Sequence, residues 1–460
     1  MTVRPVTQAT PARPGRSNRA AMDLARWTAA LALSAAGLTA CTASESEVRP
    51  DPDRLFFPTA VAVAPDDSVA FVVSANSDLT YDSGTVQPVD LAAVEQAVVA
   101  WRTNATVPAD CTVDADATET LVCPAKPFLI DGGGVRIGNF ATSIATQDLG
   151  AGKLRLLVPV RGDPSLTWMD WDPADRHLRC GSGAGFALCD DAHRIVELTG
   201  PSDPPGLATE PYAVFVDSVA EVAVVAHLEG GVVSLIDTPA AGTPTLVDAV
   251  AVGIRGGLSA IAGRRPGADD VFYAQSSSDD RVFLLTAQRQ AGRQPFLLSG
   301  GFFFQNAVGS GAGTGGIAAD ARGLVFRGGG DRAYFINRAP PALQRYDTSL
   351  GPTGVPLNRV VASTDICRHA TGVAVADPGD GERAYVSCYS DGRLAVVDAR
   401  SGGAVEATPL VGQGPTAVAA VASRRLVLVT NFFDDGVAVV DVDPASPYRN
   451  RVVLRLGGKS

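Results

Sequence analysis

The sequence predicts an all-β fold in which seven similar modules, each of four antiparallel strands, close into a ring. The segment Pro58–Pro65 (PTAVAVAP) has a close copy 357 residues later in Pro415–Ala422 (PTAVAAVA). Between the copies one order recurs, in which an apolar strand and a polar turn precede an apolar run that usually ends in Asp. Glycine and proline supply 48 and 31 of the 460 residues, which suits a chain rich in turns. Repetition of small antiparallel sheets predicts a single β-propeller.

Four modules carry the repeat clearly. Their strands are apolar runs between Gly, Pro, Asp or Asn residues, and continuously apolar strands need cover on both faces. Packing of one blade on the next supplies that cover. The predicted strands are Ala60–Val63, Ala70–Ser74 and Val86–Asp90 (first), Ala213–Val216, Val222–Ala226 and Gly231–Asp237 (third), Thr371–Ala376, Arg383–Ser387 and Leu394–Asp398 (sixth), and Ala417–Val421, Leu426–Asn431 and Gly436–Asp441 (seventh).

Three further modules match the repeat less well, and the fourth lacks the closing Asp. Six or eight modules therefore remain alternatives to seven. The weaker strands are Thr142–Ala145, Leu154–Val158 and Leu166–Asp170 (second), Leu258–Ala262, Val271–Ala274 and Val282–Thr286 (fourth), and Gly323–Phe326, Ala333–Asn337 and Leu343–Asp347 (fifth).

The modules average roughly 60 residues, above the ~40–50 typical of propeller repeats. We expect the excess in three insertions, at 91–140, 172–208 and 287–322. Apolar residues of the first insertion recur at helical spacing and predict a helix there. They are Leu91, Val94, Val98 and Trp101.

Two segments, Pro58–Ser74 and Thr371–Asp398, resemble the YVTN family of propeller repeats. That family's pattern runs P-x-G-V-A-V-x-P-D-G, then Y-V-x-N, then V-x-V-I-D. The resemblance extends over residues 56–458 and implies a β-propeller domain across that range. It says little about activity.

The N-terminal segment 1–40 is predicted to be a signal peptide. Five Arg residues precede an apolar run, Trp27–Leu38, which is shorter than the about 20 residues of a membrane span. A basic region followed by such a run is typical of secretion signals. The run ends in LTAC, and Leu38–Cys41 resembles the lipobox of bacterial lipoproteins. This resemblance implies cleavage before Cys41 and a lipid anchor on its thiol.

The lipobox resemblance also implies a location. The chain would be held at the cell envelope through the lipid on Cys41, with 41–55 as the lipidated cysteine and linker. Thr42, where Asp would retain a protein at the inner membrane, implies the outer membrane. An ordinary signal peptide with a chance cysteine is the alternative, and Met22 is an alternative start.

The charge balance excludes one class of partner. The full chain has a net charge of −11, and removal of residues 1–40, with five Arg and one Asp, gives −15. Nucleic-acid binding needs a basic surface, so we expect none.

Six cysteines follow Cys41, and an even number in an exported chain predicts disulfides. Fifteen pairings are open, and the spacing favours neighbours. The last pair is the firmest because its members lie at the same end of adjacent antiparallel strands. A metal site would need closely spaced pairs such as C-x-x-C, which the sequence lacks. The favoured pairs are Cys111–Cys123, Cys180–Cys189 and Cys367–Cys388.

Acidic residues recur with the repeat and are therefore better explained by turns than by chemistry. Turns between the second and third strands could suggest calcium, but Asp-Gly supplies the positive φ of a hairpin. Aspartates that close the third strand fit Asx-type capping. The turns are Ser277–Asp280, Tyr389–Gly392 and Phe433–Gly436, and the closing residues are Asp90, Asp170, Asp237, Asp347, Asp398 and Asp441.

Other candidates are weaker. The chain has four histidines, His177, His193, His227 and His369, of which His227 and His369 are the ones to test for a channel site. Glycine tracts at 181–185 and 309–316 lack the G-K-[ST] of a phosphate loop. Asn104–Thr106 matches a glycosylation pattern only.

The sequence thus predicts a monomeric, envelope-anchored, non-enzymatic propeller that presents loops to an envelope protein or glycan. No catalytic residue, metal or cofactor is predicted. The alternative is a lactonase-like hydrolase with its site at the central channel, since propellers resembling this one include sugar-lactone hydrolases. Convergence of two or more carboxylates with a histidine at one channel mouth would favour that alternative. A haem- or quinone-linked dehydrogenase subunit lacks the expected C-x-x-C-H.

Overall fold

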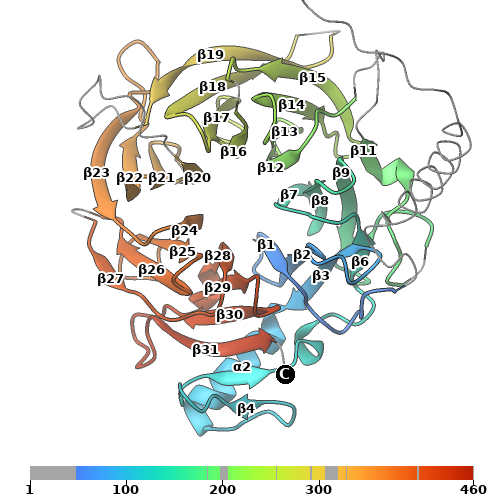
Figure 1. The fold of residues 1–460 in the computed structure, drawn as a ribbon, viewed down its shortest axis with the longest axis vertical. Coiled ribbons are helices and arrows are strands. Elements are labelled where there is room, and N and C mark those ends of the chain that lie inside the picture. The colour runs from blue at the N-terminus through green and yellow to red at the C-terminus, as the bar shows by residue number, and fades with distance from the viewer. Residues whose placement is uncertain are drawn as a thin grey trace, which may run out of the picture. The chain divides into compact units, whose positions relative to one another are not determined.

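A computed structural model describes residues 48–183, 185–196, 206–254, 256–290, 293–305, 320–327, 329–400 and 403–458. In this part of the chain, seven antiparallel sheets are arranged as blades around a central axis (Figure 1). The seven-bladed propeller that the repeat predicts is confirmed. Each blade runs outward in chain order, so its first strand is innermost.

The blades have the following strands. Blade 1 contains β1 (Pro58–Val63), β2 (Val69–Ser74), β3 (Gly84–Asp90) and β6 (Val135–Ile137), and blade 2 contains β7 (Ala145–Gly150), β8 (Lys153–Val160), β9 (Ser165–Asp172), β10 (His177–Arg179) and β11 (Arg194–Val196). Blade 3 contains β12 (Pro211–Asp217), β13 (Val222–His227), β14 (Val232–Asp237) and β15 (Thr245–Ala251). Blade 4 contains β16 (Leu258–Gly263), β17 (Val271–Ser276), β18 (Arg281–Gln288) and β19 (Phe296–Phe304). Blade 5 contains β20 (Ala321–Phe326), β21 (Arg332–Arg338), β22 (Pro341–Asp347) and β23 (Arg359–Asp365). Blade 6 contains β24 (Ala370–Ala376), β25 (Arg383–Cys388), β26 (Arg393–Asp398) and β27 (Val405–Ala407), and blade 7 contains β28 (Pro415–Val421), β29 (Leu426–Asn431), β30 (Gly436–Asp441) and β31 (Arg451–Gly457), with β5 (Leu121–Cys123) and β4 (Thr112–Val113) added at its outer edge.

The second strand is buried along its whole length in four of the blades. In β2, β13, β25 and β29 every residue is buried, and these strands are almost continuously apolar. Each lies between two neighbouring blades, so both of its faces are removed from water. Burial of apolar surface on both faces is the main stabilising contribution in such a stack.

Two boundaries differ from those expected from the sequence. The innermost strand of blade 2 is β7, which starts at Ala145 and not at Thr142, because only Ala141 pairs with the next strand before it. Part of the expected insertion 287–322 is regular structure, since β19 pairs with β18 as the fourth strand of blade 4. The glycine tract 309–316 lies outside the described residues.

The insertion at 172–208 completes blade 2. The outer edge of β9 pairs with β10 along one half and with β11 along the other. The Cys180–Cys189 disulfide closes the loop between these two strands. Residues 197–205 are outside the described part.

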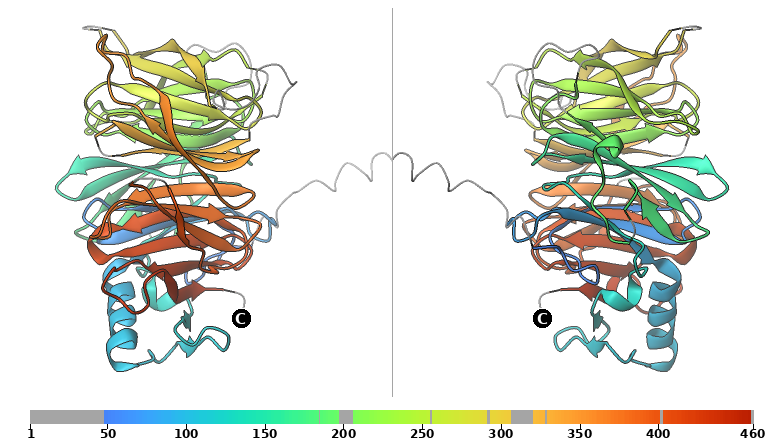
Figure 2. Two further views of the ribbon diagram at one scale, coloured as in Figure 1. Left: turned by 90° about the vertical axis from the view of Figure 1, so that its left-hand side faces the viewer. Right: turned by 90° about the vertical axis from the view of Figure 1, so that its right-hand side faces the viewer.

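The first insertion forms a clasp, by which we mean residues 91–129. It contains the predicted helix, α2 (Leu91–Asn104), the strands β4 and β5, and a short 3₁₀ turn, Lys126–Phe128. Asp90 caps the helix by accepting hydrogen bonds from the backbone of Ala92 and Ala93. Figure 2 shows α2 and the adjoining hairpin projecting from the blades.

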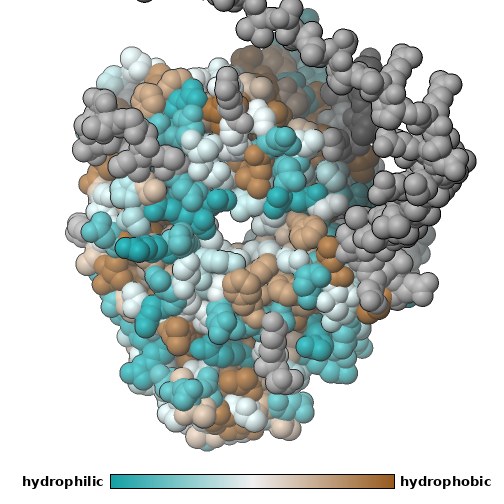
Figure 3. All heavy atoms as spheres, viewed as in Figure 1, coloured by the Kyte–Doolittle hydropathy of each residue, from teal (hydrophilic) through white to brown (hydrophobic). Residues whose placement is uncertain are grey.

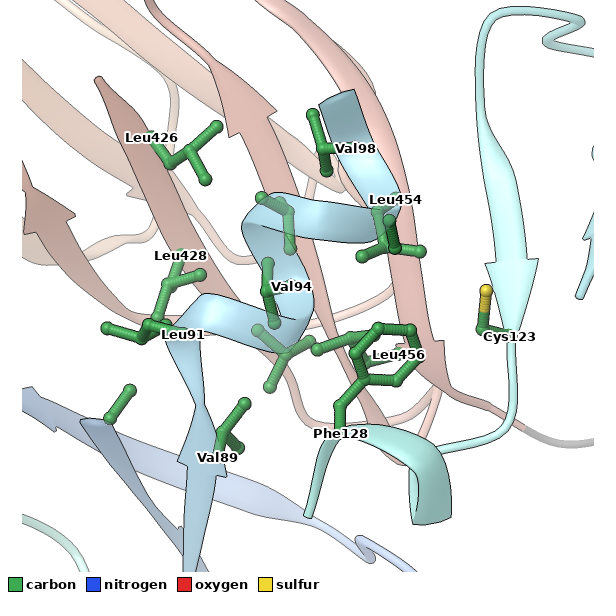
Figure 4. Close-up of a cluster of buried hydrophobic side chains, with 14 of the residues drawn as sticks. Val89, Leu91, Val94, Val98, Cys123, Phe128, Leu426, Leu428, Leu454 and Leu456 are labelled. Atoms are coloured by element: carbon green, nitrogen blue, oxygen red, sulfur yellow. The ribbon is translucent and has the colours of Figure 1, made fainter. Parts of the chain in front are cut away.

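The clasp joins the first blade to the last. Its strand β5 pairs in parallel with β31 of blade 7, while Leu91, Val94 and Val98 of α2 pack in one cluster with Leu428 and Leu454 (Figure 4). Ring closure in this chain therefore adds strands from blade 1 to the edge of blade 7.

Polar contacts support the same junction. Arg102 of α2 forms an ion pair of 2.5 Å with Asp441, whose side chain is fully buried. Thr120 donates a hydrogen bond of 2.7 Å to the carbonyl of Val452.

No helix in the described part is both long and apolar enough to cross a membrane.

Candidate functional site

The central channel is lined by residues at the start of the innermost strands and, in blade 2, directly before it. It encloses a cavity of about 400 Å³. Each blade contributes three consecutive residues, in the order polar or aromatic, small, and aliphatic, with Ser143 as the one polar residue at the middle position. The lining residues are Thr59–Val61, Thr142–Ile144, Tyr212–Val214, Ser259–Ile261, Arg322–Leu324, Thr371–Val373 and Thr416–Val418. Figure 3, viewed from the same side as Figure 1, shows an opening at the centre of the ring, bordered partly by hydrophilic residues.

A bulge frees the first lining residue from its own sheet. The pairing of β1 with β2 shifts register between Pro58 and Ala60, so Thr59 is left without a partner in the ladder. Five other blades have a register shift at the same place. An unpaired bulge residue can aim its side chain away from the ladder, here toward the next blade.

At five of the seven equivalent positions this side chain is a hydroxyl that bonds to the next blade. Thr59 donates to the carbonyl of Ala141 at 2.8 Å, and Thr416 donates to that of Pro58 at 3.0 Å across the junction of the last and first blades. The two copies noted in the sequence therefore meet. The other three donors are Thr142 to Tyr212 at 2.6 Å, Thr371 to Pro415 at 2.9 Å, and Ser259 to Ala321.

Two blades break this pattern. Tyr212 occupies the position in blade 3 and Arg322 occupies it in blade 5. The carbonyl of Ala370, which a hydroxyl at 322 would reach, instead accepts a hydrogen bond of 2.6 Å from Nε of Arg338. Blade 5 therefore places two guanidinium groups at the channel mouth.

One carboxylate lies between these two cations. Asp320 accepts a hydrogen bond from Nε of Arg322 at 2.7 Å and lies 3.6 Å from Nη1 of Arg338. Burial, and then the like charge of Arg322, lower the pKa of Arg338, whereas Asp320 and Tyr212 act in the opposite direction. Asp320 thus joins the two guanidinium groups in one cluster.

Aromatic side chains line another sector of the same mouth. Phe57, just before β1, lies 5.1 Å from Phe432, which lies 5.0 Å from Phe433, which in turn lies 5.8 Å from Tyr389 (ring centroids). Phe432, Phe433 and Tyr389 belong to turns between second and third strands, and Phe433 is 45 % exposed. Exposed aromatic side chains on loops that a rigid scaffold holds are typical of binding surfaces.

The histidines do not converge on the channel. His227 is fully buried, and its ring lies 2.9 Å from both the carbonyl of Thr209 and the hydroxyl of Ser234. His369 is exposed at the mouth and bonds to Ser390 at 2.6 Å. His193 stacks on Trp168 and pairs with Asp190, and His177 bonds to its own turn at Asp175.

The acidic residues of the repeat stabilise turns, as expected. Asp435 has φ of 54° and Gly392 φ of 65° in their hairpins. Asp398 accepts hydrogen bonds from the side chain and backbone of Arg400, which lower its pKa to about 2. Asp170 and Asp237 are exceptions because their described hydrogen bonds come from the side chains of Arg155 and Arg289 and not from the backbone of a turn.

The six cysteines form the three neighbouring disulfides that the spacing favours, 111–123, 180–189 and 367–388. Cys41 lies outside the described residues. Within the part of the chain that the structure describes, no three His, Cys, Asp or Glu side chains are grouped so as to hold a metal ion.

Tyr212, Arg322 and Arg338 were not predicted as site residues. Tyr212 and Arg322 had a signal in the sequence, because each directly precedes the first predicted strand of its module, Ala213–Val216 or Gly323–Phe326, whereas Arg338 had none. Thr59 and Thr416 hold the same place before the predicted strands Ala60–Val63 and Ala417–Val421, so Tyr212 and Arg322 are exceptions at a position where other modules carry a hydroxyl.

Comparison with known proteins supports the fold only. No model of a protein family matches the sequence, and no curated protein does either. Among solved structures, a putative 6-phosphogluconolactonase of Bacteroides fragilis is similar, with a TM-score of 0.54 at 13% identity over 86% of this chain and 99% of that one. The Kuenenia stuttgartiensis hydrazine synthase gives 0.52 at 14% identity over 87% and 99% of the two chains, and a Lactobacillus plantarum protein gives 0.50 at 17% identity over 76% and 91%.

Proposed function

We propose that the chain is an exported β-propeller of the YVTN type, anchored to the envelope membrane by a lipid on Cys41, and that it binds a ligand or partner at the channel mouth. One observation carries the binding role. The channel is lined by hydroxyl, small and aliphatic side chains with one tyrosine and one arginine, and no carboxylate or imidazole is among the described lining residues.

Three disulfides support the export of the chain. Such bonds form and persist in oxidising compartments and are rare in the cytosol of most organisms. A lipobox-like segment directly before Cys41 supports the anchor, and Thr42 supports sorting to the outer membrane. The linker 42–55 would then separate the ring from the lipid.

A lactonase-like hydrolase is the second candidate, because a putative 6-phosphogluconolactonase shares this fold. Ester hydrolysis needs a group that activates water, usually a carboxylate or histidine within hydrogen-bond reach. At the described mouth, Asp320 is engaged by Arg322, and His369 bonds to Ser390. This arrangement lacks the pair of carboxylates with a histidine that would favour hydrolysis.

The anchor is tested by replacing Cys41 with Ser in the full-length chain. We expect the wild-type protein to incorporate a labelled fatty acid and to sediment with membranes, and Cys41→Ser to lose the label and become soluble. Replacement of Thr42 by Ala, beside the acylated residue, should leave both properties unchanged. A wild-type protein without label would contradict the anchor.

The binding role is tested separately with the purified protein. Turnover of a defined lactone, abolished by substitutions at Arg322 or Asp320 but not by substitutions on the outer strands, would overturn it in favour of the hydrolase.

A further inference from the structure

At the first lining position, five blades carry a hydroxyl that links neighbouring blades, and blades 3 and 5 depart from this pattern. Where Ser or Thr occupies the first lining position, its hydroxyl bonds to a carbonyl of the next blade. Tyr212 and Arg322 cannot be explained by that role. Their side chains are the largest polar groups that line the channel.

Arg322 keeps hydrogen-bonding capacity for a ligand. Its Nε bonds to Asp320, and its two terminal nitrogens have no hydrogen-bond partner among the described residues. The side chain lines the cavity and is 26 % exposed, so it remains accessible to a ligand. A guanidinium group with free planar donors matches the geometry of a carboxylate or phosphate.

The local charge is positive in an acidic chain. Arg322 and Arg338 share the single carboxylate of Asp320, which leaves one excess positive charge at the mouth of a molecule whose net charge is −11. Arg338 is only 15 % exposed and is fixed by the carbonyl of Ala370. A cation held in a partly enclosed space attracts an anion more strongly than one on an open surface.

Tyr212 faces this group from blade 3, with blade 4 between them. Its hydroxyl has no hydrogen-bond partner among the described residues, and its side chain lines the same cavity as Arg322. A phenol can donate a hydrogen bond to an anion that the arginines hold.

We propose that Arg322, Arg338 and Tyr212 form a binding site for the carboxylate or phosphate group of a small organic anion. The inference rests on the proposed binding function and names its ligand class. A cavity of about 400 Å³ holds a compound of metabolite size. The five hydroxyls at the first lining positions are engaged between blades, so the charged groups are the feature by which the site recognises its ligand.

The experiment is calorimetric titration of the purified protein with two probes, inorganic phosphate and acetate, at constant ionic strength. Arg322→Thr and Tyr212→Thr restore the residue that most blades carry. The hydroxyl at 322 can then donate to the carbonyl of Ala370, so we expect the variant to fold. Tyr212→Phe removes only the phenolic hydroxyl and serves if Tyr212→Thr is unstable.

We expect saturable binding of at least one probe, with the dissociation constant raised by about tenfold or more in Arg322→Thr. The probe that binds identifies the recognised group. Arg359→Thr is the matched control, because Arg359 lies in the same blade on the outer strand β23 and is 68 % exposed. It should bind as the wild type does.

Absence of saturable binding by the wild type, or an equal loss in Arg359→Thr and Arg322→Thr, overturns the site. Neither result affects the membrane anchor, which the Cys41→Ser experiment tests on its own. Failure of the anion site and failure of the anchor are thus distinguishable.

Discussion

His227 shows how the ring accommodates a polar side chain at the end of a buried strand. Its imidazole is fully buried at the end of β13, between a backbone carbonyl and the hydroxyl of Ser234. Burial lowers the pKa of His227 to about 4, although hydrogen bonding to Thr209 acts the other way. The residue is therefore neutral and structural at pH 7.

We expect the free energy of unfolding to decrease as pH falls from about 6.5 to about 4. An unfolded chain protonates this imidazole near pH 6.5, but the folded chain does so only near pH 4, so acid favours the unfolded state in this window. The shift corresponds to about 3 kcal/mol. Denaturant unfolding at several pH values measures it. An unchanged pH profile in His227→Gln would contradict this assignment.

Substitution of Thr59 tests the hydrogen bonds that hydroxyls at the first lining position donate to the next blade. Thr59→Val keeps the shape of the side chain but leaves the carbonyl of Ala141 without its donor. We expect a loss of about 1–2 kcal/mol in the free energy of unfolding. Thr59→Ser retains the hydroxyl and should lose less. A larger loss in Thr59→Ser than in Thr59→Val would show that packing of the methyl group, and not the hydrogen bond, matters.

At the scale of elements, the clasp closes the ring by adding β5 and β4 to the outer edge of blade 7. The helix α2 was predictable because four apolar residues recur at helical spacing, and three of them are buried as expected. The pairing of β5 with β31 was not. These segments are more than 300 residues apart, and a strand of three residues carries no pattern that could identify its partner. The displaced start of β7 could not be predicted either. Residues 142–144 lie outside the ladder, between the pairs Ala141–Val160 and Ala145–Leu157, although their residue types are those of the repeat.

The disulfide Cys111–Cys123 closes the loop that holds β4 and β5. We expect Cys111→Ser/Cys123→Ser to lower the free energy of unfolding by about 2–4 kcal/mol. Amide hydrogens of β31 should exchange faster, because the clasp covers the edge of that strand.

Cys180→Ser/Cys189→Ser is the matched control, as it opens a loop of similar length in blade 2. That variant should leave exchange in β31 unchanged. Equal effects of both variants on β31 would contradict a role for the clasp in closure.

At the scale of the whole molecule, a repeated scaffold makes exceptions informative. The fold was predictable since the same apolar runs and turns recur seven times, and the three disulfides followed from their spacing. The mouth of the channel was not predictable, because residues of blades 3 and 5 line one cavity only once the ring closes. Acidic turns and closing aspartates proved to be parts of the repeat, whereas Tyr212 and Arg322 are departures from it.

The central claim is that this mouth binds an anionic ligand without transforming it. Calorimetry with an aldonic acid and, separately, with its lactone tests the claim most directly, because binding gives heats that decay to saturation and turnover gives a continuing heat flow. We predict saturable binding of the aldonate and no heat from the lactone beyond its hydrolysis in buffer. A continuing heat flow that scales with protein concentration and disappears in Arg322→Thr would contradict the claim.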